Sequence, residues 1–167
     1  MARRRFNPTP RRKKVWADLK ISTAGFAEDV HQTNDLLADF VTNGGSTQGV
    51  TVLRTIITAS WLINEAHTAQ DSLVFGFIKG TKTAADAADV DLEPYADWAW
   101  HDTSWAGYPH GLVTADVGSW YRADVHSMRK INEVGETWWL VYKGSAPTTA
   151  TATYDIRARV RTLLLLP

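Results

Sequence analysis

The residues of this chain that could bind a charged ligand are concentrated at its beginning. Residues 1–14 contain seven cations and no acid: Arg3, Arg4, Arg5, Arg11, Arg12, Lys13 and Lys14. Clustered Lys and Arg neutralise phosphates and release counterions, and this attraction depends on charge density more than on geometry. We therefore expect residues 1–14 to be a disordered basic arm that binds nucleic acid. A solubility tail or a localisation signal is the alternative.

The rest of the chain has the opposite charge. Residues 15–167 hold 11 Lys and Arg against 18 Asp and Glu, a net charge of −7, so the whole chain sums to zero. A basic tail on an acidic body is typical of proteins that meet nucleic acid or an anionic surface. The chain has no cysteine, which excludes a disulfide scaffold, a thiolate zinc site and a cysteine nucleophile.

A second group of cations alternates near the end of the chain, at Arg157, Arg159 and Arg161. In a strand this spacing places all three side chains on one face. Such guanidinium groups point into solvent, pair with carboxylates of the same or a neighbouring subunit, or line a surface that faces phosphate. Salt bridges within or between subunits are favoured here, and we predict that these arginines belong to a subunit interface.

Tryptophan is abundant, with eight in the chain. Trp98, Trp100 and Trp105 have the chemistry to stack on sugars or bases. Aromatic residues are also enriched at protein interfaces, so we predict that these three contact partner subunits. Trp138 and Trp139 are adjacent, so in a strand one faces the core and the other faces outward, towards a ligand or a protein partner.

The sequence offers little for catalysis or metal binding. The five histidines form no i,i+2 or i,i+4 pair, and no nucleophile elbow, HExxH or phosphate-binding loop occurs. Four acids lie close together without the central glycine of a calcium-binding loop: Asp86, Asp89, Asp91 and Glu93. A solvated acidic loop is the favoured interpretation. We therefore predict a protein that is not an enzyme and has no catalytic residue, no cofactor and no metal.

Targeting signals are also missing from the pattern. No apolar run approaches the roughly 20 residues of a spanning helix, and the basic start lacks the apolar region of a secretory signal. Pro8 and Pro10 argue against the helix of a mitochondrial presequence. We expect a soluble protein that is cytosolic at synthesis and has no membrane partner.

The elements that position these residues are mostly strands. Residues 15–22, 50–63, 72–79, 119–127, 136–143 and 150–165 are predicted strands, bounded by turn signals. Residues 34–41 are a predicted helix capped by Asn34 and ended by residues 43–45. Residues 84–93 and 94–111 are predicted loops. The fold class is all-β, an antiparallel sandwich or barrel over residues 15–167.

Period-two patterning assigns faces to two of the strands. One face of residues 119–127 is expected to hold Tyr121, Ala123 and Val125, and the other to hold Arg122, Asp124 and His126. In residues 150–165 the core face is expected to hold Ala152, Tyr154, Ile156, Ala158 and Val160, opposite Asp155 and the three arginines.

A short arginine-rich arm with prolines precedes the β-rich body. Residues 51–55 (TVLRT) open a long strand, residues 124–130 (DVHSMRK) lead into a strand with tryptophans, and residues 159–163 (RVRTL) come near the end. This layout resembles the single jelly-roll capsid proteins of small icosahedral viruses and phages, particularly those with single-stranded genomes. The resemblance covers the whole chain, through architecture and not through a diagnostic motif.

The resemblance implies a sandwich of eight strands in two sheets with Greek-key connections, whose missing strands would come from residues 15–22 and 84–118. It also implies many identical subunits in an icosahedral shell, with the arm inside on the genomic DNA or RNA, and location in the virion after synthesis in the host cytoplasm. Two alternatives remain open. One is a tryptophan-rich module that binds carbohydrate or serves in attachment, and the other is a single-strand nucleic-acid-binding protein.

Overall fold

The computed structural model describes residues 12–27, 30–63, 72–87, 98–102, 120–145 and 153–167. Within these ranges the chain forms eight strands and two short helices. In chain order they are β1 (Lys14–Ala27), β2 (Gln32–Asp35), α1 (Ala38–Thr42), β3 (Thr51–Ile63), β4 (Ser72–Gly80), α2 (Lys82–Ala87), β5 (Trp98–Asp102), β6 (Trp120–Lys130), β7 (Thr137–Ser145) and β8 (Thr153–Leu165).

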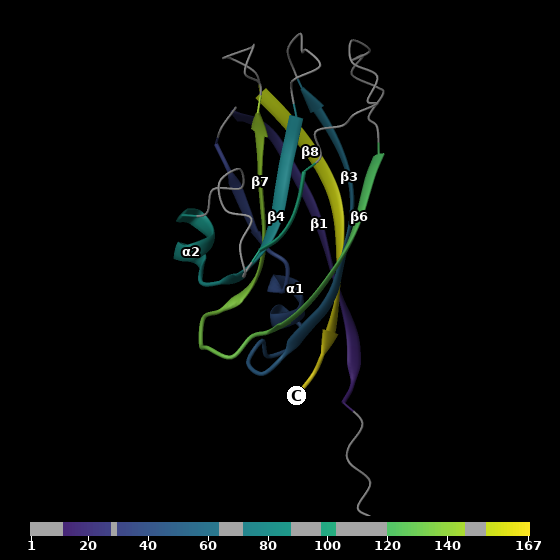
Figure 1. Cartoon of the computed structure of the whole chain (residues 1–167), viewed down its shortest axis with the longest axis vertical. Helices are drawn as coiled ribbons and strands as arrows, with labels where there is room; N and C mark the ends of the chain where they lie inside the picture. Colours follow the sequence, from purple (N-terminus) through teal and green to yellow (C-terminus); the bar gives the residue numbers. More distant parts are fainter. Residues whose placement is uncertain (1–11, 28–29, 64–71, 88–97, 103–119, 146–152) are drawn as a thin grey trace, which may run out of the picture.

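The strands form two four-stranded antiparallel sheets that pack face to face (Figure 1). One sheet has the order β1-β8-β3-β6 and the other has the order β2-β7-β4-β5. Apart from β4 and β5, consecutive strands lie in different sheets, so the chain crosses repeatedly between the layers. Two interleaved Greek keys of this kind define a jelly roll. The fold is a single jelly roll.

Burial along β8 follows the predicted alternation. Tyr154, Ile156, Ala158 and Val160 are buried, while Arg157 and the following odd-numbered positions up to 161 are exposed. β8 pairs with β1 on one side and β3 on the other, so it is a central strand. β6 also behaves as predicted, with Ala123 buried and its neighbours at 122 and 124 exposed. The sequence pattern therefore identified the core face of both strands.

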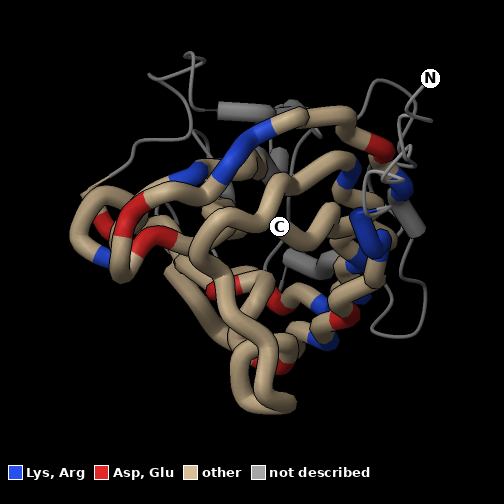
Figure 2. Tube along the Cα trace, turned by 90° about the horizontal axis from the view of Figure 1, so that it is seen from below, with Lys and Arg blue, Asp and Glu red and all other residues tan. Residues whose placement is uncertain are grey.

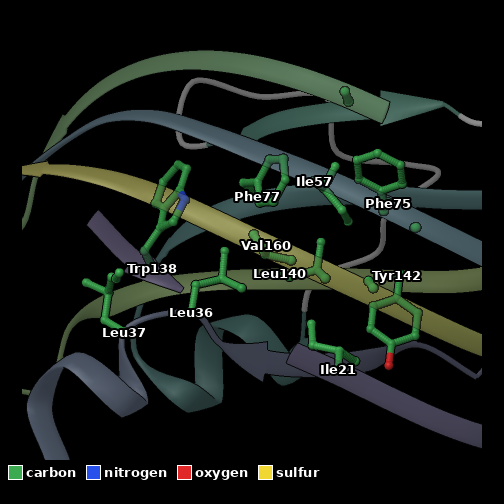
Figure 3. Close-up of a cluster of buried hydrophobic side chains, with 14 of the residues drawn as sticks. Ile21, Leu36, Leu37, Ile57, Phe75, Phe77, Trp138, Leu140, Tyr142 and Val160 are labelled. Atoms are coloured by element: carbon green, nitrogen blue, oxygen red, sulfur yellow. The ribbon is translucent and has the colours of Figure 1, made fainter. Parts of the chain in front are cut away.

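The core fills the space between the sheets. Ile57 and Val160 project from one sheet towards Phe77, Trp138 and Leu140 of the other (Figure 3). Phe77 stacks on Trp138 with ring centroids 6.1 Å apart. The other buried residues labelled in the figure are Ile21, Leu36, Leu37, Phe75 and Tyr142. Burial of this apolar area is the main favourable contribution to folding.

The helix predicted over residues 34–41 is wrong at its beginning. Asn34 lies in β2, and α1 begins only at Ala38. Asp35 Oδ1 accepts hydrogen bonds from Leu37 N and from Thr137 Oγ1, both at 2.8 Å. These bonds attach the segment to the start of β7. The apolar spacing of the leucines therefore marks a turn packed into the core, and the N-cap of α1 is Leu37, without a side-chain capping hydrogen bond.

Two predicted loops contain regular structure. Residues 98–102, inside the predicted loop 94–111, form β5, which pairs with β4 from Ile78↔Trp98 to Val74↔Asp102. Residues 82–87 form α2, which overlaps the start of the predicted loop 84–93. The residue pattern had left out two strands, β2 and β5, and with them the described residues contain the eight strands that the resemblance implies; of the two, only β5 lies in the region 84–118 named for a missing strand. Its hydrogen bonds are made to a distant strand, which a local sequence pattern does not reveal.

Trp138 and Trp139 face opposite sides of β7, as predicted, but the outward one is not an open platform. Trp139 is 8% exposed and belongs to a second cluster with Ala85 of α2. Its Nε1 donates to the carbonyl of Gly80 at 2.9 Å, and Lys82 Nζ lies 5.8 Å from its ring centroid. The expected ligand or partner contact at Trp139 is therefore replaced by a helix of the same chain.

Candidate nucleic-acid interface

The basic segment joins the jelly roll at the beginning of β1. Arg12, Lys13 and Lys14 are exposed, and Lys14 is the first residue of the strand. The Lys13 carbonyl accepts a hydrogen bond of 2.9 Å from Leu166 N. The start of β1 therefore lies beside the C-terminal end of the chain (Figure 1). Arg3, Arg4, Arg5 and Arg11 lie outside the described residues.

The three C-terminal arginines face solvent on the sheet β1-β8-β3-β6, and each has a different environment. Arg159 Nε lies 3.0 Å from both carboxylate oxygens of Asp18, and its Nη2 donates a further hydrogen bond to Oδ2. The guanidinium of Arg159 lowers the pKa of Asp18 below its ordinary value of 3.8. Since this bridge is intramolecular, part of the predicted stripe is paired within the chain.

Arg161 stacks on an aromatic ring of the neighbouring strand. Its guanidinium carbon lies 4.7 Å from the ring centroid of Trp16, which is 41% exposed. This cation–π geometry holds the guanidinium against the sheet. Arg157 lies between Ser22 of β1 and Ser60 of β3 and has no ion pair with the described residues.

A matching arginine–carboxylate pair lies on the β3–β6 side of the same sheet. Arg54 Nε donates to Asp124 Oδ1 at 2.6 Å, and Arg54 Nη2 donates to Oδ2. The hydrogen bonds from Arg54 lower the pKa of Asp124. His126 Nε2 lies 3.8 Å from the same carboxylate. Two bidentate pairs therefore lie on this sheet face, one near each edge strand.

Two of the three tryptophans predicted to contact partner subunits lie in β5. Trp98 and Trp100 lie in β5, an edge strand of its sheet, and Trp105 lies outside the described residues. Of the acidic cluster, only Asp86 falls in the described part, where it accepts hydrogen bonds from Lys82 Nζ and Thr33 Oγ1. Asp89, Asp91 and Glu93 lie outside it.

The described residues contain no group of three or more His, Cys, Asp or Glu placed to hold a metal ion. Their helices are too short or too polar to span a bilayer.

No protein-family model and no characterised protein matches this chain by sequence. Among solved structures it is similar to the tobacco streak virus coat protein dimer, with 12% identity and a TM-score of 0.46 over 92% of this chain and 86% of that one. It is also similar to the decameric BFDV capsid protein, with 7% identity and a TM-score of 0.40 over 94% and 100% of the two chains. The 60-mer of the BFDV capsid protein gives 9% identity and a TM-score of 0.35 over 94% and 96%. All three are coat or capsid proteins. At these identities, the assignment of the fold depends on the strand order of this chain itself.

Several charged residues of the sheet face had no predicted role. Lys20 and Arg54 were not singled out, because each is one cation in an otherwise ordinary strand. Arg122 and Asp124 were assigned to the outward face without a role. The available signal was the alternation of each strand, but only the register between strands places these residues beside the predicted arginine stripe.

Proposed function

We propose that this chain is a structural capsid subunit that assembles with identical copies into a closed icosahedral shell around nucleic acid. The jelly roll is used by viral capsid domains, lectins and cupins, so the fold alone does not choose among them. The observation that carries the proposal is the charge division. Seven cations without an acid lead directly into β1, while residues 15–167 have a net charge of −7.

The two parts have complementary roles in such a shell. The basic segment 1–14 binds phosphates and brings many copies onto one polyanion. The acidic body keeps subunits apart except where specific contacts form. Weak contacts repeated around a closed symmetric object stabilise it through their number. We propose that Trp98 and Trp100 of the edge strand β5, together with Trp105, contribute such contacts.

The same proposal implies where the protein is located and that its role is structural. A capsid subunit is located in the virion after synthesis in the host cytoplasm, and its role is structural, without a catalytic step. The nucleic acid is held by Arg3, Arg4, Arg5, Arg11, Arg12, Lys13 and Lys14. Since Lys13 is hydrogen-bonded to Leu166, this segment joins the domain at a fixed point at the beginning of β1.

Sedimentation velocity of the purified full chain tests assembly. We expect particles of megadalton mass that absorb at 260 nm, in equilibrium with small species as the salt concentration is raised. A stable monomer at high protein concentration and low salt, with residues 1–14 intact, would contradict the assembly proposal.

A second experiment tests the nucleic-acid role of the basic segment. In the full chain, Arg3, Arg4, Arg5, Arg11, Arg12 and Lys13 are replaced by Gln, and Lys14 is kept because it belongs to β1. We expect co-purifying nucleic acid to be lost while the circular dichroism of the β-fold is unchanged. The control is Lys82→Gln, an exposed cation of α2, which should retain the nucleic acid. Unchanged nucleic-acid content in the six-residue variant would contradict the assigned role.

A further inference from the structure

The solvent-facing side of the sheet β1-β8-β3-β6 has an excess of positive charge. Alternation with buried neighbours places eleven charged side chains on this cationic face, eight basic and three acidic. The basic ones are Lys14, Lys20, Arg54, Arg122, Lys130, Arg157, Arg159 and Arg161, and the acidic ones are Asp18, Asp124 and Asp155. Figure 2 shows many Lys and Arg positions on the flank where this sheet lies, with fewer Asp and Glu positions between them.

Strand register arranges three of these cations in one row. Lys20 of β1 lies opposite Arg159 of β8. Thr58 of β3 lies opposite Arg159 on the other side, and Arg122 of β6 lies opposite Thr58. Neighbouring strands are about 4.8 Å apart, so the row crosses the sheet over roughly 14 Å. Like charges opposite each other, such as Lys20 and Arg159, destabilise a sheet unless an anion lies between them.

The acids of this face do not neutralise it. Asp18 is held by Arg159 and Asp124 by Arg54, each through bidentate hydrogen bonds, and Asp155 Oδ1 accepts a hydrogen bond of 2.8 Å from Gly25 N. Lys20, Arg122 and Arg157 have no ion pair with the described residues and are exposed. Three cations on three different strands are thus available to a ligand.

The cationic face is also continuous with the basic segment. Lys14, the last cation of that segment, lies on the same side of β1 as Lys20. They are six residue steps apart along the strand, about 20 Å at 3.3 Å per residue. A polyanion bound to the basic segment therefore lies next to the end of the cationic face that begins at Lys14.

We propose that the cationic face binds the phosphate backbone of a nucleic acid strand, with Lys20, Arg122 and Arg157 as the cations that contact phosphates. This inference depends on the proposed function, since the packaged nucleic acid is the ligand. A nucleic acid strand carries one negative charge per nucleotide, so it can contact cations that are spread over several β-strands. Such a ligand does not require carboxylates in a matching pattern. Guanidinium groups bind phosphate through two parallel hydrogen bonds, which suits Arg122 and Arg157.

The test replaces the unpaired cations in the full chain, as Lys20→Gln, Arg122→Gln and Arg157→Gln, and leaves residues 1–14 intact. Binding of fluorescent 30-nucleotide dT and U strands is measured by anisotropy against salt concentration at nanomolar protein. Each phosphate contact to a single strand contributes about 0.7 to the slope of log K against log salt. The slope is therefore expected to fall by about 2 in the triple variant. If it falls with only one of the two nucleic acids, the sugar of that nucleic acid is the one that the face prefers.

The control has the same net charge but changes other surfaces. Gln48→Glu, Thr83→Glu and Ala87→Glu lie at exposed positions before β3 and in α2, and this variant should keep the slope. An equal loss in the control would show a general charge effect and overturn the proposal. An unchanged slope in the triple variant also overturns it. If that variant fails to assemble while its slope is unchanged, the face is a subunit contact.

A gain-of-function variant gives an independent measurement. Thr58 is the gap in the row between Arg159 and Arg122, and Thr58→Lys fills it. The slope is expected to rise by about 0.7, and no rise contradicts the proposal. The two functional claims fail separately. If the variant neutralised at residues 3–13 still binds fully, only the role proposed for the basic segment is contradicted. If the slope is unchanged in the triple variant, only the role proposed for the cationic face is contradicted.

Discussion

Thr55 and Thr162 lie opposite each other in the central strands β3 and β8, and only one of their hydroxyl groups has a partner in the described part of the chain. Thr55 Oγ1 accepts a hydrogen bond of 3.0 Å from Trp138 Nε1, across the space between the two sheets. The Oγ1 of Thr162 is buried and has no hydrogen-bond partner there. The hydroxyl of Thr55 therefore connects the two sheets, whereas the hydroxyl of Thr162 does not.

Thr55→Val should therefore destabilise the fold more than Thr162→Val does. The first change leaves Trp138 Nε1 buried without an acceptor, which costs about 1–3 kcal/mol. The second removes a hydroxyl that has no partner, so its effect should be near zero or stabilising. Urea unfolding of the two variants gives both free energies. Equal losses would contradict the assigned role of the inter-sheet hydrogen bond.

Trp139→Ala should cost about 3–5 kcal/mol of unfolding free energy, the scale for truncating a buried aromatic side chain. Trp139 is 8% exposed beneath α2, whereas Trp16 is 41% exposed. Trp16→Ala is the matched control and should cost clearly less, because it mainly removes the contact with Arg161. Chemical denaturation measures both losses. A small loss for Trp139→Ala would mean that α2 does not cover this residue.

Glu136→Ala should destabilise the turn between β6 and β7, whereas Glu133→Ala should not. The Glu136 carboxylate accepts hydrogen bonds from the backbone N–H groups of Asn132 and Glu133, at 3.3 and 3.1 Å. Lys79 Nζ lies 3.4 Å from it. The Glu133 side chain is exposed. The expected difference is about 1–3 kcal/mol, because two backbone donors in part-buried hydrogen bonds and a cation lose their partner. Thermal unfolding of both variants measures it, and equal midpoints would refute the assignment.

The bridge between Asp18 and Arg159 should stabilise the fold at neutral pH and lose this effect in acid. Hydrogen bonding from Arg159 lowers the pKa of Asp18 in the folded state below its ordinary value of 3.8. A lowered pKa stabilises the fold above the ordinary value, and the stabilisation is lost as the pH falls through 3.8 and the lower folded pKa.

Asp18→Asn measures this contribution directly. The difference in unfolding free energy between the wild type and Asp18→Asn should be constant from about pH 5 to 7 and should shrink below pH 3.8. Arg159→Gln should show the same pH dependence, because either change removes the pair. Urea titrations over this pH range are the measurement, and a difference that grows towards acid would have the wrong sign.

Much of the fold could be predicted from local patterns. The alternation of Tyr154, Ile156 and Ala158 with polar neighbours identified β8 and its buried face. The β-branched run at residues 50–63 predicted β3 nearly to its bounds. Such patterns work because a strand between core and solvent requires a period of two. β5 was missed because its residues 98–102 have aromatic, acidic and small neighbours that are equally common in loops.

The candidate site could be predicted only in part. The basic segment is a feature of composition, so the sequence alone names its cations. The face that carries Arg157 depends on which strands lie beside β8, and the partners of that strand begin more than 90 residues earlier in the chain. One of the two adjacent tryptophans at 138 and 139 was expected to be open to a partner, because strand alternation says that neighbouring side chains point in opposite directions but not what covers them.

The sequence by itself determined the division into a basic segment and an acidic body, the strand character of most of the chain, and which side chains alternate. Tertiary structure alone decided that Arg159 meets Asp18, 141 residues away in the sequence, and that Lys20, Arg159 and Arg122 share one row. The physical reason is that strand pairing is non-local. Backbone hydrogen bonds are alike at every residue, so the register is chosen by the packing of the whole core.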